Sequence, residues 1–160
     1  MKQTLVILAA ALVLNACTAI SQERQEAAGP KEMRMAFDVT DSATAPLIVK
    51  LETIETTRKQ LIDAGYTPRI VVTFRGNASF FTQSDMALVK EADRADVARI
   101  QGMLRKMKHD QVVESLEQCN IPLGPRKIQA QNLMQEVKLV PNGWIALAEY
   151  QKKGYAYIAP

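Results

Sequence analysis

Ile70-Val71-Val72-Thr73-Phe74 is the stretch that decides the fold of this chain. The run is continuously rich in β-branched and aromatic residues, with no polar alternation, which is typical of a strand covered on both faces in a parallel sheet. Pro68 precedes it, and Arg75-Gly76-Asn77 follows with residues that favour a turn. The sequence therefore predicts a buried strand at 70–74 in a sheet whose two faces are both packed.

The segments before this strand predict another strand and a helix. Residues 33–39 are a short alternating run of strand-forming residues, and we expect the first strand there. Apolar residues then recur at helical spacing from 47 to 62. Pro46 suits the first turn of this helix, and Gly65 suits its C-terminal stop.

The segments after the central strand continue the alternation. The pattern predicts a short helix at Phe80 and Phe81 and a long helix over 85–108, with one apolar stripe and a charged opposite face. Residues 112–119 predict a third strand, which we place at an edge of the sheet because it is polar. Residues 125–134 predict a modest helix.

The C-terminal quarter predicts a strand, a helix and a last strand. Residues 137–140 form a short apolar run, and Pro141-Asn142-Gly143 turns the chain. Helical spacing follows from Trp144 up to Gly154, and 155–158 predicts a fifth strand. Strands that alternate with helices indicate an α/β domain with a mostly parallel sheet of about five strands.

Ligands of parallel α/β sheets favour the crevice beyond the carboxyl ends of the strands. Asp38, Arg75 with Gly76 and Asn77, and Cys119 all fall at predicted strand ends. Three separate segments should therefore meet at one edge and form a candidate substrate site. The Gly76-Asn77 pair would present backbone N–H groups to an anion, or it is only a turn.

The N-terminus has the layout of a bacterial lipoprotein signal. A basic start at Lys2 precedes an apolar stretch from Leu5, and Leu14-Asn15-Ala16-Cys17 ends it with a small residue before a cysteine. The stretch is too short for a spanning helix. We expect a signal peptide at 1–16 and lipid on Cys17; an ordinary cleaved signal peptide is the alternative.

The polar segment 17–31 reads as a tether, and 32–160 as one compact domain. The expected location is the periplasm, with lipid that anchors the protein to a bacterial membrane. Thr18 is not the aspartate associated with inner-membrane retention, so the outer membrane is favoured.

Composition and motifs exclude several functions. The chain has 20 basic and 17 acidic residues, a net charge of +3, and no basic run with interleaved aromatic residues, so nucleic acid is not an expected partner. His109 is the only histidine and reads as a surface residue, so no zinc site is expected. Glycine motifs for nucleotides and the nucleophile-elbow motif are absent, and no cofactor is expected.

A resemblance rests mainly on the C-terminus. Gly143-Trp144-Ile145-Ala146-Leu147 opens a helix, and Gln151-Lys152-Lys153-Gly154 followed by Tyr155-Ala156-Tyr157-Ile158-Ala159-Pro160 ends the chain. These runs resemble the DsrE/DsrF-like family. Ile70 to Gly76 resembles the family's second strand and the glycine after it, and Cys119 matches a position where many members carry a cysteine. The order of segments agrees over 32–160.

This resemblance implies a three-layer α/β/α fold that forms trimers or larger rings. Some relatives work in sulfur relay, where a cysteine thiolate accepts sulfane sulfur as a persulfide and passes it on, and Cys119 would be that residue. A donor or acceptor protein for sulfur would then be a partner. Members often have a histidine where this chain has Arg75.

Two functions follow for the mature protein. If Cys17 carries lipid, Cys119 is the only thiol left in the mature protein. A single thiol in an exported protein is either reactive, or forms a disulfide with another molecule, or is a buried apolar side chain. The first hypothesis is sulfur transfer at Cys119, with Arg75 as the cation that stabilises the thiolate. The second is a non-catalytic, oligomeric lipoprotein that binds a ligand or partner.

Overall fold

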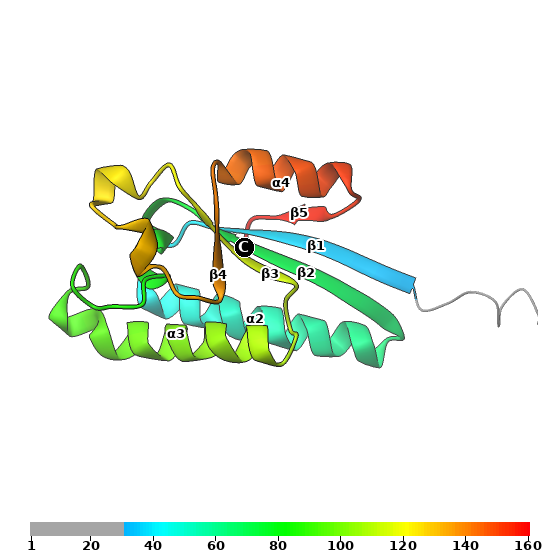
Figure 1. Cartoon of the computed structure of the whole chain (residues 1–160). Coiled ribbons are helices and arrows are strands. Elements are labelled where there is room, and N and C mark those ends of the chain that lie inside the picture. The colour runs from blue at the N-terminus through cyan, green and yellow to red at the C-terminus, as the bar shows by residue number, and fades with distance from the viewer. Residues whose placement is uncertain (1–30) are drawn as a thin grey trace, which may run out of the picture. The chain divides into compact units, whose positions relative to one another are not determined.

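The computed structural model describes residues 31–160 (Figure 1). The expected signal peptide at 1–16, the lipidation of Cys17 and nearly all of the tether at 17–31 lie outside the described residues. The strands are β1 (Lys31–Val39), β2 (Tyr66–Phe74), β3 (Ser115–Cys119), β4 (Val137–Val140) and β5 (Ala156–Ile158), and the helices are α2 (Thr44–Asp63), α3 (Arg94–His109) and α4 (Gly143–Lys152). Short 3₁₀ turns lie at Gly76–Phe81, Glu91–Asp93, Gly124–Arg126 and Ala130–Asn132.

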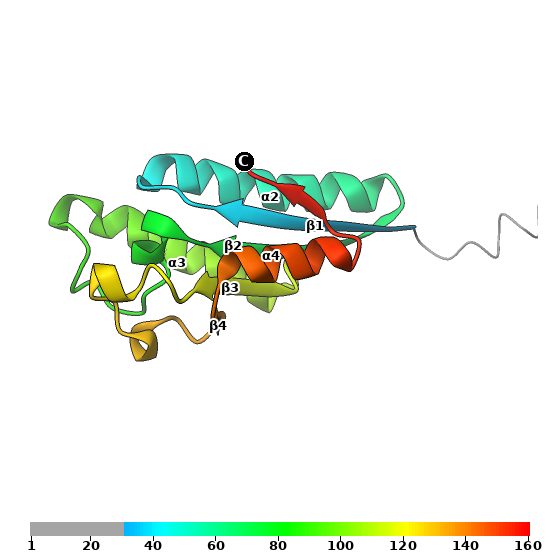
Figure 2. The ribbon, with the colours of Figure 1, turned by 90° about the horizontal axis from the view of Figure 1, so that it is seen from above.

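The five strands form one parallel sheet in the order β4-β3-β2-β1-β5. From β1 to β4 the chain moves stepwise across the sheet, and β5 then returns to the far side of β1. Right-handed crossovers in opposite directions place their helices on opposite faces. Accordingly α2 and α3 cover one face and α4 covers the other, which confirms the three-layer α/β/α fold (Figures 1 and 2).

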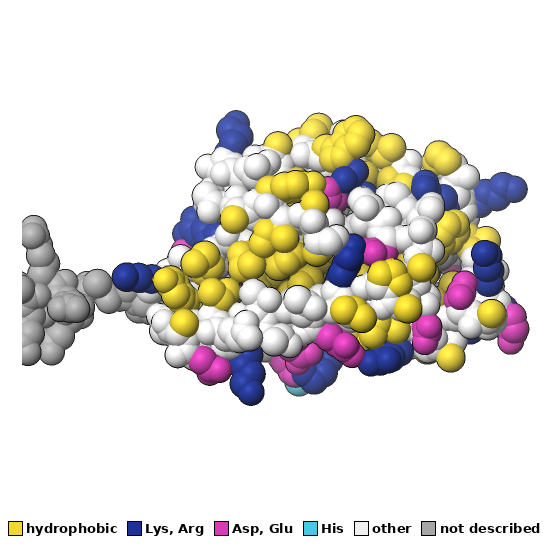
Figure 3. All heavy atoms as spheres, turned by 180° about the vertical axis from the view of Figure 1, so that it is seen from behind, with side chains coloured by type: hydrophobic (Ala, Val, Ile, Leu, Met, Phe, Trp, Pro, Cys, Tyr) yellow, Lys and Arg dark blue, Asp and Glu magenta, His cyan; other side chains and the backbone are white. Residues whose placement is uncertain are grey.

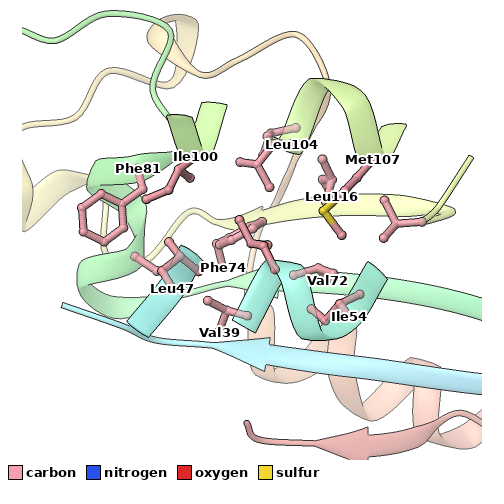
Figure 4. Packing of buried hydrophobic residues seen from close by; sticks show 14 of the residues in the cluster. Val39, Leu47, Ile54, Val72, Phe74, Phe81, Ile100, Leu104, Met107 and Leu116 are labelled. Atoms are coloured by element: carbon pink, nitrogen blue, oxygen red, sulfur yellow. The ribbon is translucent and has the colours of Figure 1, made fainter. Parts of the chain in front are cut away.

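The main core lies between the sheet and the pair α2 and α3. Val72 and Phe74 of β2 point into it with Leu116 of β3, and they meet Leu47 of α2 and Leu104 of α3 (Figure 4). All of these side chains are fully buried. Because side chains alternate along a strand, the residues between them face α4.

The face under α4 has a much smaller apolar cluster, formed by Ala36, Val71 and Leu147 with Tyr150 and Tyr155 at its margin. The other inward positions on this face are occupied by the polar side chains of Asp38, Thr73 and Glu117 and by Cys119, all buried. Hydrophobic side chains also gather on the surface over α4 (Figure 3). The α4 layer is therefore the polar layer of the fold, and the candidate site lies there.

The strand predicted at 112–119 is shorter than expected and is not at an edge. β3 begins at Ser115 and lies between β2 and β4. Its polar side chains are buried because distant residues bond to them: Gln118 bonds to Thr82 and Ser79 at 2.8 Å each, and Glu117 accepts from Tyr150 at 2.7 Å. Buried polar groups are tolerated when they have such partners.

Two predicted helices are also corrected. The helix expected over 85–108 begins only at Arg94; before it, the Asp85 carboxylate accepts from the Ala87 N–H in a turn, and a 3₁₀ turn covers Glu91–Asp93. The helix expected over 125–134 is two separate 3₁₀ turns. The first of them ends at Lys127, which has a left-handed φ of 57° that a right-handed helix cannot continue.

Candidate functional site

A cavity of about 230 Å³ lies at the carboxyl edge of the sheet, where β2, β3 and β4 end. The chain leaves β2 toward the α3 layer and leaves β4 toward α4 on the opposite face, so the connections diverge there, as they do at ligand sites of related sheets. The lining is mostly apolar, with two guanidinium groups, and consists of Arg75, Gly76, Cys119, Ile121, Pro122, Pro125, Arg126, Asn142 and Trp144.

Cys119 is the last residue of β3, and its thiol is held at the N-terminus of α4. The side chain is 3% exposed and forms no disulfide in the described structure. Its Sγ accepts a hydrogen bond from the Gly143 N–H at 3.1 Å, and the Asn142 side chain caps the next amide, Trp144, at 3.0 Å. Helix N-termini carry partial positive charge, so the sulfur lies at the positive end of α4.

Gly143 leaves room for the side chains of both Arg75 and Cys119 beside the start of α4. A Cβ at Gly143 would lie 2.7 Å from Cδ and 2.9 Å from Cγ of Arg75, and 3.1 Å from Cβ of Cys119. These distances are too short for ordinary van der Waals contact, so only glycine fits without a shift. The missing side chain is what allows α4, Arg75 and Cys119 to meet at one point.

Asp38 fixes the orientation of Arg75 from behind. Arg75 donates from Nε to Oδ1 at 2.7 Å and from Nη2 to Oδ2 at 2.5 Å, and Tyr157 Oη donates to Oδ2 at 2.7 Å. The hydrogen bond to Asp38 raises the pKa of Arg75, although burial opposes it, and the bond to Asp38 also raises the pKa of Tyr157. Bidentate pairs of this kind restrict the guanidinium to one plane.

The indole of Trp144 closes the outer side of Arg75. The Arg75 Cζ lies 5.1 Å from the ring centroid, within the range of a cation–π contact. Trp144 is nevertheless 66% exposed, which is unusual for a residue of this size. It forms the rim of the cavity and leaves a large apolar surface to solvent.

The structure brings most of the residues proposed from sequence together. Arg75, Gly76 and Cys119 line the cavity, and Gly76 has a positive φ of 55° that turns the chain after β2. Asp38 does not line the cavity, because its carboxylate is occupied by Arg75 and Tyr157. Asn77 lies beside a different hollow, and its side chain accepts from Arg126.

Arg126, Gly143 and Tyr157 shape the site, although the sequence did not propose them as site residues. Arg126 lines the cavity from the loop after β3, and no local pattern marks it. Gly143 looked like part of an ordinary turn, although its place directly before a helix is a signal that a close approach needs glycine. Tyr157 stands in the terminal strand motif, where alternation alone could have placed it on the same face as Asp38.

The described part of the chain offers neither a metal centre nor a membrane-spanning helix. Within residues 31–160 no cluster of three His, Cys, Asp or Glu side chains is arranged to hold a metal ion. No helix in that same range is long and apolar enough to cross a membrane. His109 is on the surface, where its Nδ1 lies 2.8 Å from an oxygen of Asp110.

The chain belongs to the DsrE/DsrF-like family, whose model matches residues 29–160. An uncharacterized protein of Aquifex aeolicus (strain VF5) is 28% identical over 126 residues, which cover 79% of this chain and 55% of that protein. This chain thus spans about half the length of that relative. A solved structure of similar fold is the protein of unknown function MTH1491 from Methanobacterium thermoautotrophicum, with a TM-score of 0.51, 22% identity, and coverage of 81% of this chain and 99% of that one.

Proposed function

We propose that Cys119 accepts sulfane sulfur as a persulfide and passes it on. The observation that carries this proposal is the position of Sγ: it accepts from the Gly143 N–H at the start of α4 and lines a cavity that also contains two arginines. Both the helix N-terminus and a nearby guanidinium stabilise an anionic sulfur, whether thiolate or persulfide. Membership of a family with sulfur-relay members supports the same role.

The chemistry can be written for thiosulfate as the donor. The Cys119 thiolate attacks the sulfane sulfur, a new S–S bond forms, and the S–S bond of thiosulfate breaks. Sulfite leaves with the electron pair, and Cys119 holds the sulfur as a persulfide anion. A second thiolate then takes the outer sulfur and returns Cys119 to its starting state.

The test is the intact mass of the purified protein after incubation with thiosulfate or polysulfide. We expect a gain of one sulfur that a reductant removes, and no gain in Cys119→Ser. The serine hydroxyl can still accept from Gly143, so this variant should keep its fold and thermal stability. A folded protein that gains no sulfur from either donor would sink the proposal.

We also propose, from the sequence, that the protein is periplasmic and anchored by lipid on Cys17, with the outer membrane favoured, and that it assembles as a trimer or a larger ring. Labelled palmitate should enter the wild type and not Cys17→Ser. Sedimentation of the purified protein should give a mass several times that of one chain. Label in the serine variant, or a monomer at all concentrations, would contradict these points.

A second candidate function is a non-catalytic, oligomeric lipoprotein that binds a ligand or a partner. Exposed apolar residues around the cavity favour it, because Trp144, Ile145 and Ile121 are 66%, 58% and 57% exposed. Apolar surface of this kind marks many interaction sites. Full biological function in Cys119→Ser would favour this candidate; loss of function with an intact oligomer would favour thiol chemistry.

A further inference from the structure

Arg126 is the cavity cation whose charge has no acidic partner in the described structure. Arg75, the other guanidinium of the lining, is neutralised by Asp38. Within residues 31–160, no carboxylate lies within ion-pair distance of Arg126. The cavity lining also contains no Asp or Glu. The cavity therefore carries one unit of uncompensated positive charge, and Arg126 supplies it.

Neutral acceptors hold Arg126 in place. Its Nε and Nη2 donate to Asn77 Oδ1 at 3.1 and 2.8 Å, and its Nη1 donates to the Pro122 carbonyl at 3.3 Å. A guanidinium has five N–H donors, so two remain for a ligand. Amide and carbonyl partners orient the group and leave its charge intact, which prepares it for an anion.

The walls of the cavity suit a small ligand. Pro122, Pro125 and Ile121 are rigid or apolar, and the thiol of Cys119 contributes to the same lining. A volume of about 230 Å³ accommodates a compact inorganic anion together with some water. One ligand can therefore contact the Arg126 guanidinium while it lies in the same cavity as the thiol.

We propose that Arg126 is the residue that selects the sulfur donor, and that this donor is a small anion that carries a sulfonate, of which thiosulfate is the simplest example. The inference rests on the proposed role of Cys119 and names the class of its substrate. Arg126 binds the sulfonate, and the sulfane sulfur lies toward Cys119. Sulfite then departs from a group that already holds its charge.

Binding is tested apart from chemistry in the Cys119→Ser background, where no sulfur can be transferred. Thermal unfolding is followed as thiosulfate is added, with sodium chloride at equal ionic strength as reference, since a ligand that binds only the folded state raises Tm. We expect stabilisation in Cys119→Ser and in its Arg105→Gln derivative. Arg105 is exposed on α3, so its replacement is a charge-matched control.

Arg126→Gln in the same background should weaken the apparent affinity about three- to tenfold, which is the effect of one nearby charge at the rim of a protein. Arg126→Lys keeps the charge, so its affinity for thiosulfate should lie between that of the Cys119→Ser parent and that of the Arg126→Gln derivative. Equal stabilisation by thiosulfate in the Gln variant and in the Arg105 control, or no stabilisation in any of them, would overturn the inference. If Arg126→Gln does not fold, the test is the thiosulfate affinity of Arg126→Lys compared with that of Cys119→Ser alone.

Alkylation of the wild-type thiol gives a second test. Anionic iodoacetate and neutral iodoacetamide differ mainly in charge, so the ratio of their rates at Cys119 measures anion preference; Arg126→Gln should lower this ratio, and Arg105→Gln should not. If the ratio and the thiosulfate affinity fall but the wild type never gains sulfur, the anion site stands and the proposed function fails. If the wild type gains sulfur but Arg126→Gln changes neither the rate ratio nor the thiosulfate affinity, the proposed function stands and the anion site fails.

Discussion

The backbone N–H of Gly143 donates to Sγ of Cys119 over 3.1 Å, and this bond joins the end of β3 to the first residue of α4. These two residues are 24 positions apart in the sequence, and the whole loop with β4 lies between them. The bond places the thiol at the positive end of a helix. The geometry of the site therefore depends on how closely α4 approaches the sheet.

Gly143→Ala should disturb this approach. The new Cβ would clash with Cγ and Cδ of Arg75, so Arg75 or the start of α4 must move. We expect a loss of about 1–3 kcal/mol in the free energy of unfolding, as for other overpacked sites, and a changed rate of Cys119 alkylation. Urea unfolding and alkylation followed by mass measure the two effects.

Gly102→Ala is the matched control, because Gly102 lies inside α3 with open space around it. Alanine there should raise stability by about 0.5–1 kcal/mol. If both alanine variants gain stability and alkylate like the wild type, the close approach of Arg75 to Gly143 is not a constraint.

Asp38→Asn should destabilise the fold and release Arg75. Asp38 is buried and accepts three hydrogen bonds, so the amide would place an N–H against a donor and leave the guanidinium without its counter-charge. We expect a loss of about 3–5 kcal/mol, the usual range when one partner of a buried ion pair is removed. Unfolding in urea measures it.

The matched control is Glu91→Gln, which removes the carboxylate of an exposed ion pair with Arg94 and should cost less than about 1 kcal/mol.

The double variant tests whether the Asp38–Arg75 pair is coupled. Asp38→Asn combined with Arg75→Gln should recover part of the stability that Asp38→Asn loses, because no lone charge then stays in the protein. Additive losses in the double variant would show that the pair is not coupled.

Thr73→Val should leave the stability unchanged or raise it. Thr73 Oγ1 is buried and has no hydrogen-bond partner in the described structure; the neighbouring Glu117 Oε2, across the strand pair, also has none. Removing an unsatisfied buried hydroxyl relieves its desolvation cost, so we expect a gain of up to about 1 kcal/mol.

Thr82→Val is the counterpart, because its hydroxyl is equally buried but donates to Gln118 Oε1 at 2.8 Å. This change leaves an acceptor unpaired and should cost about 1–3 kcal/mol. Thermal and urea unfolding compare the two variants. A similar loss for Thr73→Val would mean that its hydroxyl has a partner, such as a bound water.

Alkaline pH should unfold the protein through its C-terminal tyrosines. Burial, and then the hydrogen bond to Glu117, raise the pKa of Tyr150; burial first, and then Glu114, raise that of Tyr155. Unfolded tyrosines ionise near pH 10, while these folded ones stay protonated. The folded state therefore holds more protons, so the free energy of unfolding falls as pH rises above about 10.

The fall should be smaller in Tyr150→Phe, which has one such proton fewer. Urea unfolding at several pH values between neutrality and the alkaline range, with tyrosinate absorbance as a second readout, measures the slope. An identical slope in wild type and Tyr150→Phe would contradict the prediction.

The sequence predicted most elements where local pattern is strong. The continuous apolar run at 70–74 lies in a strand packed on both faces, and the alternating run at 33–39 lies in β1. Patterns failed where a polar side chain is satisfied from far away. Residues 112–119 were predicted as an edge strand, since nothing nearby shows that Tyr150 and Thr82 supply partners for Glu117 and Gln118.

The candidate site was partly predictable, because the positions of strand ends can be read from the sequence. The rule that parallel strands end at one edge grouped Arg75 with Cys119, and it also brought in Asp38, which lies behind Arg75 and outside the cavity. Arg126 could not be found this way. Its position depends on two short turns that replace the expected helix at 125–134, and on a left-handed Lys127 that ends the first of them.

The sequence by itself determined the alternation of strands and helices, the sheet edge at which the candidate site residues gather, and the family, because these follow from repeating patterns and local turn chemistry. Only the tertiary structure decided that β5 returns beside β1, that α4 covers the face opposite α2 and α3, and that its first N–H meets Cys119. Those outcomes depend on contacts between segments far apart in the chain, and which segments meet is set by packing of the whole domain.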